Sequence, residues 1–377
     1  MATGPSIDLV PVTSRRLLRA FIDLPHRLYR DEPAYVPRLF VQQKEQLSRR
    51  NPYFRHSDAG YLLARRGGEF LGRIAWFLNA QHLRFSGRRE LLFGCFDAVD
   101  DPAVSEALLG AVHGQARALA CTAVLGPIEF STNDTCGLLI DGFDRPPALL
   151  MPFQAPHHAA LLAHAGYQTV QELHAYEIRG ADRPPFLEAL AGRLEARLAP
   201  RGIAVRAMDF SRFQAEVEAL YPIYEAIFSG NWGFMPLSRA EFLHMAAGLR
   251  QVSAPDFALV AERNGAPIGY AVGVFDANEV FASFRRGRLL PFNFFRLGRI
   301  RKVKRLKILN LGVVPAFQNL GLDLLMATRL FEAGLRRGMD AAEASYVMGS
   351  NLRMQRAILR LNGRLTKRYA IFRKELP

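Results

Sequence analysis

Cysteine is scarce in this sequence, with only Cys95, Cys121 and Cys136 among 377 residues. Their number is odd and no two are spaced as CxxC, so neither a disulfide framework nor a zinc site is indicated, and buried reduced thiols are expected. The histidines between residues 157 and 174 lie without a carboxylate-rich set of partners. We therefore predict no metal cofactor.

Long apolar runs are also absent, because no segment reaches the roughly 18 residues needed to span a bilayer. The N-terminus, MATGPSIDLVPVTSRR, lacks the charged start and the continuous apolar stretch of a secretion signal. Half of the residues are hydrophobic and 22% are charged, which is an ordinary balance for a soluble protein. We expect a cytoplasmic location, with peripheral attachment to the inner membrane as the alternative.

Carboxylates are missing between Glu279 and Asp323, although the chain as a whole has a net charge of +14. Within this gap, residues 285–307 (RRGRLLPFNFFRLGRIRKVKRLK) hold ten lysines and arginines. Such a segment attracts polyanions, namely nucleic acid, an anionic membrane surface or a phosphorylated cofactor. Bulky apolar side chains among the basic ones favour anionic lipid, and no aromatic stacking motif for specific nucleic-acid binding is found. A solvated cationic loop is the alternative.

An internal repeat is visible at an offset of 197 residues. Residues 63–75 (LARRGGEFLGRIA) align with 260–272 (VAERNGAPIGYAV), and each stretch predicts a β-hairpin around a glycine turn. At the same offset, 159–168 (AALLAHAGYQ) align with 356–365 (RAILRLNGRL), each a short helix ended by glycine and followed by a strand. Two matches at one offset argue for two copies of one α/β unit.

Each copy is predicted to be a mixed α/β unit, since a strand and a hairpin are followed by strands that alternate with helices. The long helices are expected at 102–119 and 321–337. The first copy carries a proline-rich insertion at 126–156, and the second carries the basic–aromatic segment. We expect a first domain at residues 1–180, a linker and helix at 181–202, and a second domain at 203–377.

The sequence VVPAFQNLGLD in the second copy predicts a strand, a short turn and a helix start. Backbone N–H groups at such a start, together with the helix dipole, suit a pyrophosphate. Gln318 and Gly321 match the pattern Q/R-x-x-G-x-G/A, whereas Asp323 replaces its last small residue. The alternative is an ordinary helix start at which Asp323 is the dipole partner.

This pattern and its context resemble the GCN5-related N-acetyltransferase (GNAT) superfamily, in which the turn binds acyl-CoA. The resemblance implies two tandem GNAT-like domains, with the acyl-CoA site in the second. The first would be degenerate, because nothing between Phe93 and Ala103 supplies Q-x-x-G. NWGFMPLSRAEF (231–242), EASYVMGSNLRMQ (343–355) and KRYAIFRKEL (367–376) further resemble a bacterial group that includes the ceramide synthases.

The resemblance implies direct transfer of an acyl group from acyl-CoA to a primary amine, without a covalent enzyme intermediate. The acceptor best matching the group is a long-chain sphingoid base, 3-oxosphinganine or sphinganine, which would give a ceramide-type amide in bacterial sphingolipid biosynthesis. The alternatives are acetyl transfer to a small polar amine, a non-catalytic lipid- or anion-binding protein, and a nucleic-acid binder.

The cofactor site is predicted from this fold, in which the pantetheine arm pairs with the fourth strand. Free amides from Leu311 to Val314 are the expected oxyanion donors, and Gly312 would allow a bulge or a close approach. The amides of the turn would hold the pyrophosphate, and an Asn at the start of the next helix would lie near the cofactor. The predicted cofactor-binding residues are Leu311, Gly312, Val313, Val314, Gln318, Asn319, Leu320, Gly321, Leu322 and Asn351.

Two residues of the fifth strand are predicted to be catalytic. Glu343 is the expected general base, because partial burial would raise its pKa; its alternative role is a structural carboxylate paired with arginine. Tyr346 is the expected proton donor to the thiolate, although strand alternation places it on the opposite face unless a bulge intervenes.

The acceptor site is predicted at NWGFMP, because in this fold the segment between the first two helices covers that site. Asn231, Trp232, Gly233 and Phe234 are the expected contacts, and the two aromatic rings suit an aliphatic or aromatic acceptor. The alternative is a hydrophobic plug under a loop.

Overall fold

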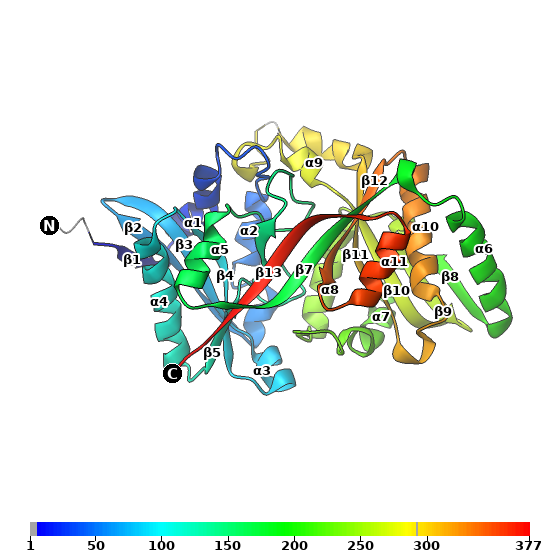
Figure 1. The fold of residues 1–377 in the computed structure, drawn as a ribbon, viewed down its shortest axis with the longest axis horizontal. Helices are drawn as coiled ribbons and strands as arrows, with labels where there is room; N and C mark the ends of the chain where they lie inside the picture. The colour runs from blue at the N-terminus through cyan, green and yellow to red at the C-terminus, as the bar shows by residue number, and fades with distance from the viewer. Residues whose placement is uncertain (1–5, 292) are drawn as a thin grey trace.

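The computed structural model describes residues 6–291 and 293–377, and it contains two successive runs of similar elements (Figure 1). The first run consists of β1 (Asp8–Pro11), α1 (Arg15–Leu28), α2 (Phe40–Gln46), β2 (Asp58–Arg66), β3 (Glu69–Leu78), α3 (Ala80–Ser86), β4 (Glu90–Ala98), α4 (Pro102–Ala118), β5 (Ala123–Gly126), β6 (Leu138–Asp141), α5 (His157–His164) and β7 (Gln168–Arg179).

After a connecting helix, the second run repeats this order except that its described residues form no counterpart of β6. It consists of α6 (Leu187–Leu198), β8 (Ile203–Ala207), α7 (Phe213–Phe228), α8 (Arg239–Arg250), β9 (Ala258–Arg263), β10 (Ala266–Phe275), α9 (Asn278–Phe281), β11 (Arg305–Val313), α10 (Leu322–Arg336), β12 (Ala341–Met348), α11 (Leu352–Arg360) and β13 (Arg364–Glu375). None of the helices in the described ranges is both long and apolar enough to cross a membrane.

The predicted hairpins form, and their pairing registers are equivalent. Ala64 lies opposite Gly72 in the β2–β3 hairpin, and Ala261 lies opposite Gly269 in the β9–β10 hairpin. A register shift adjoins each of these pairs. The repeat inferred from an offset of 197 residues therefore corresponds to two copies of the same structural unit.

The two halves share one continuous sheet with the strand order β1-β2-β3-β4-β5-β13-β7-β12-β11-β10-β9-β8, and β6 pairs with β13 beside this path. The last strand of each half lies in the other half: β13 pairs with β5, and β7 pairs with β12. Figure 1 shows β7 and β13 running side by side across the middle of the molecule. Each half of the sheet is thus completed by the other half of the chain.

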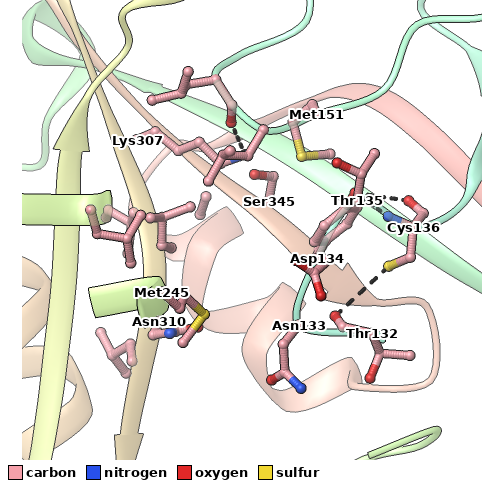
Figure 2. Close-up of a pocket in the computed structure, with 18 of the residues that line it drawn as sticks. Thr132, Asn133, Asp134, Thr135, Cys136, Met151, Met245, Lys307, Asn310 and Ser345 are labelled. Atoms are coloured by element: carbon pink, nitrogen blue, oxygen red, sulfur yellow. Dashed lines mark hydrogen bonds between the residues drawn. The ribbon is translucent and has the colours of Figure 1, made fainter. Parts of the chain in front are cut away.

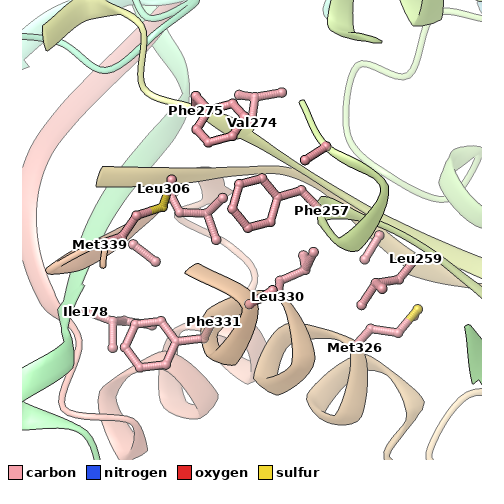
Figure 3. Packing of buried hydrophobic residues seen from close by; sticks show 14 of the residues in the cluster. Ile178, Phe257, Leu259, Val274, Phe275, Leu306, Met326, Leu330, Phe331 and Met339 are labelled. Carbon is pink, nitrogen blue, oxygen red and sulfur yellow. The ribbon is translucent and has the colours of Figure 1, made fainter. Parts of the chain in front are cut away.

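The largest buried cluster lies in the second half, between the sheet and α10. Phe257 and Phe275 stack edge to face with ring centroids 5.1 Å apart, and Leu306, Leu330 and their neighbours complete the layer (Figure 3). Burial of each such side chain contributes roughly 1.5–3 kcal/mol. This packing fixes α10 against β9–β11, and with it the turn at which α10 begins.

A parallel strand pair opens in the middle of each half. β4 pairs with β5 only as far as Leu92 and Leu125, and β11 pairs with β12 only as far as Ile308 and Ala344. In the first half the chain itself fills the opening, because the Ile128 N–H donates to the Phe93 carbonyl at 2.6 Å. In the second half residues 309–313 of β11 have no strand partner on this side, and a cavity lies there.

Candidate active site

A cavity of about 1290 Å³ lies where the two halves meet. The second half lines it with β11, the start of α10, the end of β12 and the segment from α7 to α8. The first half contributes α2, residues 130–136 and residues 149–151. Figure 2 shows Thr132–Cys136 on one side and Met245 and Asn310 on the other. A ligand large enough to span this cavity would contact both halves of the chain.

The turn before α10 has the backbone geometry of an anion site. Gly321 is the N-cap residue, no side chain caps the helix, and the first helical bond runs from the Leu325 N–H to the Gly321 carbonyl. The N–H groups of Leu322, Asp323 and Leu324 therefore have no partner within the helix. Gln318, Asn319 and Leu322 line the cavity, as does Asp323, whose charge opposes a phosphate.

Two residues of this turn face α6 instead of the cavity. The Leu320 carbonyl accepts a hydrogen bond of 2.7 Å from Arg197, and a Cβ at Gly321 would lie 2.8 Å from Leu194. Gly321 has φ +85°, so both its conformation and its surroundings require glycine. Neither Leu320 nor Gly321 lines the cavity. The cofactor contact predicted for these two residues could therefore come only from their backbone groups.

The open edge of β11 carries fewer free amides than predicted. The Val314 N–H donates to the Ile268 carbonyl at 2.9 Å, so the prediction of a free amide at Val314 is wrong. Antiparallel alternation from this bond directs the N–H groups of Leu311 and Val313 away from β10 and toward the opening. These two amides are the available donors.

Gly312 is explained by packing against a helix. A Cβ at this position would overlap Ile227 of α7, so the close approach that glycine permits here is to a helix. The bulge of this strand lies at Leu309, between the pairs Val272–Asn310 and Gly273–Ile308.

Glu343 is buried with 3% exposure and does not line the cavity. It lies opposite Lys307 in the β11–β12 register. Burial raises the pKa of its carboxyl, and the neighbouring Lys307 ammonium partly offsets that rise. The raised pKa agrees with the prediction. The carboxyl is not reached from the cavity, however, so its role as general base stays a prediction.

Tyr346 lines the cavity because β12 has a bulge. The register with β7 shifts between Ala344 and Val347, and Tyr346 has φ +59°. Its hydroxyl accepts from the Cys136 N–H at 3.0 Å and donates to the Cys136 carbonyl at 2.8 Å. Burial raises the pKa of this phenol well above its usual value. In this arrangement the Tyr346 proton is directed at the Cys136 carbonyl.

Asn351 combines the two roles considered for it. Its side chain caps α11 by accepting from the Met354 N–H at 3.0 Å, and the residue also lines the cavity. The side-chain oxygen is thus already engaged, while the amide nitrogen stays available for a contact with a ligand.

The predicted acceptor segment joins the two halves. Asn231, Trp232 and Phe234 line the cavity. Gly233 does not: it has φ +66°, and its carbonyl accepts from the Thr132 hydroxyl at 2.9 Å. Trp232 packs against the hydrophobic cluster of the first half. The segment therefore borders the cavity and is held from the N-terminal side.

Among the ionisable cavity residues that were not predicted from the sequence are Lys307 and Asp134. Lys307 is 2% exposed, and its ammonium donates to the Leu149 carbonyl at 2.6 Å; burial lowers its pKa to about 8. Asp134 lies in the 126–156 insertion, and burial raises its pKa to about 7. The insertion was visible as a proline-rich stretch, but no motif marked its residues as part of a site.

The basic–aromatic segment 285–307 forms another part of the wall. It contains 3₁₀ segments at Arg285–Gly287 and Asn293–Lys302, and Phe292 lies outside the described residues. Leu289, Leu297 and Ile300 line the cavity, whereas Phe294 and Phe295 are 58% and 82% exposed. One segment thus presents apolar groups both to the cavity and to solvent. Within residues 6–291 and 293–377 no group of His, Cys, Asp and Glu is arranged to hold a metal.

Comparisons with known proteins agree with this architecture, although no family model matches the chain. The chain is 32% identical to the bacterial ceramide synthase of Caulobacter vibrioides, covering all of this chain and 99% of that protein. It is 31% identical to protein YghO of Escherichia coli, covering 95% of this chain and 93% of that protein.

Solved structures show the same fold at low sequence identity. A tandem GNAT protein from the clavulanic acid biosynthesis pathway matches with a TM-score of 0.59 at 15% identity, covering 98% of both chains. A probable N-acyltransferase from Enterococcus faecalis matches with a TM-score of 0.53 at 9% identity, covering 98% of this chain and 73% of that one. The mixed α/β sheet predicted from the sequence is therefore that of a tandem GNAT structure.

Proposed function

The chain belongs to the GNAT-fold family that includes the bacterial ceramide synthase of Caulobacter vibrioides and YghO of Escherichia coli, and from this premise we propose that it is an acyl-CoA-dependent N-acyltransferase acting on a long-chain primary amine. The acceptor of this proposal is a sphingoid base such as 3-oxosphinganine or sphinganine, and the product is a ceramide-type amide. Membership of the family is shown by sequence identity, and the choice of this substrate is our proposal.

The observation that carries the proposal is the cavity, which contains an uncapped helix start and an open strand edge together. The amides of Leu322 to Leu324 would bind the pyrophosphate of acyl-CoA. The amides of Leu311 and Val313 would pair with the pantetheine arm or with the thioester oxygen as charge develops on it. These groups suit a thioester held in a fixed orientation beside an amine.

The size and lining of the cavity support a long apolar acceptor or acyl chain. Its volume of about 1290 Å³ is larger than the roughly 300–1,000 Å³ of ordinary ligand pockets. Trp232, Phe234 and Leu297 provide apolar wall. A small polar amine would leave most of this surface uncovered, so the acetyl-transfer alternative is less well supported.

We further propose that residues 285–307 place the enzyme on an anionic membrane surface. The exposed rings of Phe294 and Phe295 can enter the interface, and the exposed basic residues of the segment can neutralise lipid phosphates. Because the same segment lines the cavity, a lipid substrate could pass from the membrane into the site.

A non-catalytic lipid- or anion-binding role is the second candidate. Asp323 favours the absence of catalysis, because a carboxylate in the first turn of α10 weakens binding of the acyl-CoA pyrophosphate at that helix start. The two candidates differ in turnover, which a direct assay measures.

The test is thiol release together with product mass, from purified protein given palmitoyl-CoA or acetyl-CoA with sphinganine, 3-oxosphinganine or a polyamine. A long-chain amide formed from palmitoyl-CoA is the expected result. Acetylated polyamine as the only product would refute the lipid acceptor. CoA binding without turnover on any amine would favour the non-catalytic role.

A further inference from the structure

We propose that the carboxylate of Asp134, supplied by the N-terminal half, binds the acceptor ammonium and removes its proton. This inference rests on the proposed N-acyl transfer and names the group that receives the amine. Asp134 lines the cavity and lies across it from Met245 and Asn310 of the C-terminal half (Figure 2).

Hydrogen bonds to Gly233, Met235, Tyr224 and Tyr346 hold the Asp134 loop against the C-terminal half. The Thr132 hydroxyl donates to the Gly233 carbonyl at 2.9 Å, and the Asn133 amide donates to the Met235 carbonyl at 2.8 Å. On the other side of Asp134, Cys136 is held by the Tyr346 hydroxyl. Asp134 therefore lies between residues whose positions are fixed. A group that binds a substrate in one orientation needs such support.

Asp134 is the cavity carboxyl best placed to receive a cation. Four carboxyl residues line the cavity: Glu45, Asp134, Glu241 and Asp323. Glu241 already accepts from His56 and Ser238, Glu45 is exposed to solvent, and Asp323 lies at the proposed phosphate turn. The one side-chain hydrogen bond of Asp134 found in the described residues comes from the Ser131 hydroxyl, at 3.0 Å to Oδ2.

The electrostatic surroundings make this carboxyl an effective base near neutral pH. Burial raises its pKa to about 7, and the negative charges of Glu129 and Glu241 act in the same direction. The Ser131 hydrogen bond and the Arg38 guanidinium oppose the rise. A base with a pKa near the working pH is both ionised and able to accept a proton.

The step balances without any further reactant. The ammonium gives one proton to the Asp134 carboxylate, and the neutral amine attacks the thioester carbonyl carbon to form the C–N bond. As the C–S bond breaks, the second proton of the nitrogen goes to the departing thiolate, giving the amide and CoA-SH. Asp134 then releases its proton to water and returns to the carboxylate.

The experiment compares wild type with Asp134→Asn, and with Asp144→Asn as the control, since Asp144 is 80% exposed on the same insertion. Binding of dodecylamine, dodecanol and CoA is measured at pH 8, below the micelle concentration of each lipid. Thiol release with palmitoyl-CoA and sphinganine is measured from pH 5.5 to 8.5.

The expected result is a loss of about 10- to 100-fold in dodecylamine affinity for Asp134→Asn, because a hydrogen bond to a charged group is lost. Thiol release should fall by about 10²–10⁴-fold and lose its rise through pH 7. Dodecanol and CoA affinities should stay unchanged, and Asp144→Asn should behave as wild type.

The remaining outcomes separate this inference from the proposed function. Normal amine binding and turnover in Asp134→Asn would overturn the inference and leave N-acyl transfer standing. Joint loss of amine, dodecanol and CoA binding would show a structural role and also overturn it. Loss of amine binding alone, with no turnover even in wild type, would support the amine site and refute acyl transfer from palmitoyl-CoA to sphinganine.

Discussion

At the residue scale, several side chains predicted to do chemistry are held by the fold itself. Tyr346 enters the cavity wall through a bulge, yet its hydroxyl is bonded to both backbone groups of Cys136. Glu343 has the raised pKa expected of a base, but it is enclosed beside Lys307. Asp134 differs from Glu343 because it lines the cavity, and from Tyr346 because its carboxylate is not bonded to the Cys136 backbone.

Replacing Tyr346 with Phe should destabilise the protein by about 1–3 kcal/mol, because the buried N–H and carbonyl of Cys136 lose their partner. Urea unfolding measures this change, and Tyr221→Phe is the control, since that hydroxyl donates only to the Leu237 carbonyl at 3.2 Å. If Tyr346→Phe instead kept full stability while turnover fell, Tyr346 would be the proton donor predicted from the sequence.

Replacing Glu343 with Gln tests the base predicted from the sequence against Asp134. If Glu343 only balances the buried charge of Lys307, the variant should lose stability and keep the rise of turnover through pH 7. Unfolding by urea and the pH profile of thiol release give the two readouts. Turnover lowered by more than 10²-fold in a stable variant, with CoA affinity retained, would restore Glu343 as the base.

At the element scale, the basic–aromatic segment has two apolar sides. Leu297 and Ile300 line the cavity, whereas Phe294 and Phe295 face solvent. Exposed aromatic rings that lie close together indicate a surface that a membrane or another partner covers. This arrangement supports a membrane contact next to the entrance of a lipid substrate.

Replacing both Phe294 and Phe295 with Ser should weaken binding to anionic vesicles and leave the fold intact, since both rings are exposed. Flotation with phosphatidylglycerol vesicles across a salt series measures the effect, and the loss should persist at high salt, where charge attraction is screened. Phe186→Ser is the matched control, because Phe186 is 49% exposed in the segment before α6. Equal flotation of all three proteins would contradict the membrane contact.

At the scale of the whole molecule, the two copies differ in how their open strand pairs are filled. In the first copy the Ile128 N–H bonds to Phe93, and Ile128 also leaves no space for a Cβ at Gly94. In the second copy the opening leads into the cavity. The same connection that closes the first copy carries Asp134, so it also forms a wall of the site in the second copy.

Calorimetric titration with CoA should give one site per chain, because in the described residues the open strand edge beside an uncapped helix start belongs to the second copy. Two equivalent sites per chain would contradict the assignment of the cofactor to the second half.

Substituting Asp323 with Ala should raise the affinity of that site for CoA, because the substitution removes a like charge from the phosphate turn.

The sequence alone determined the repeat, the two hairpins, the order of helices and strands apart from α3, β6 and α9, and the turn at residues 318–323. These features depend on local periodicity and on glycines at turns, which neighbouring residues specify. Only the tertiary structure decided that β7 and β13 exchange halves, that the Val314 amide is bonded, and that Asp134 enters the cavity. The reason is that sheet order and cavity walls are set by contacts between residues far apart in the chain, and local patterns do not encode them.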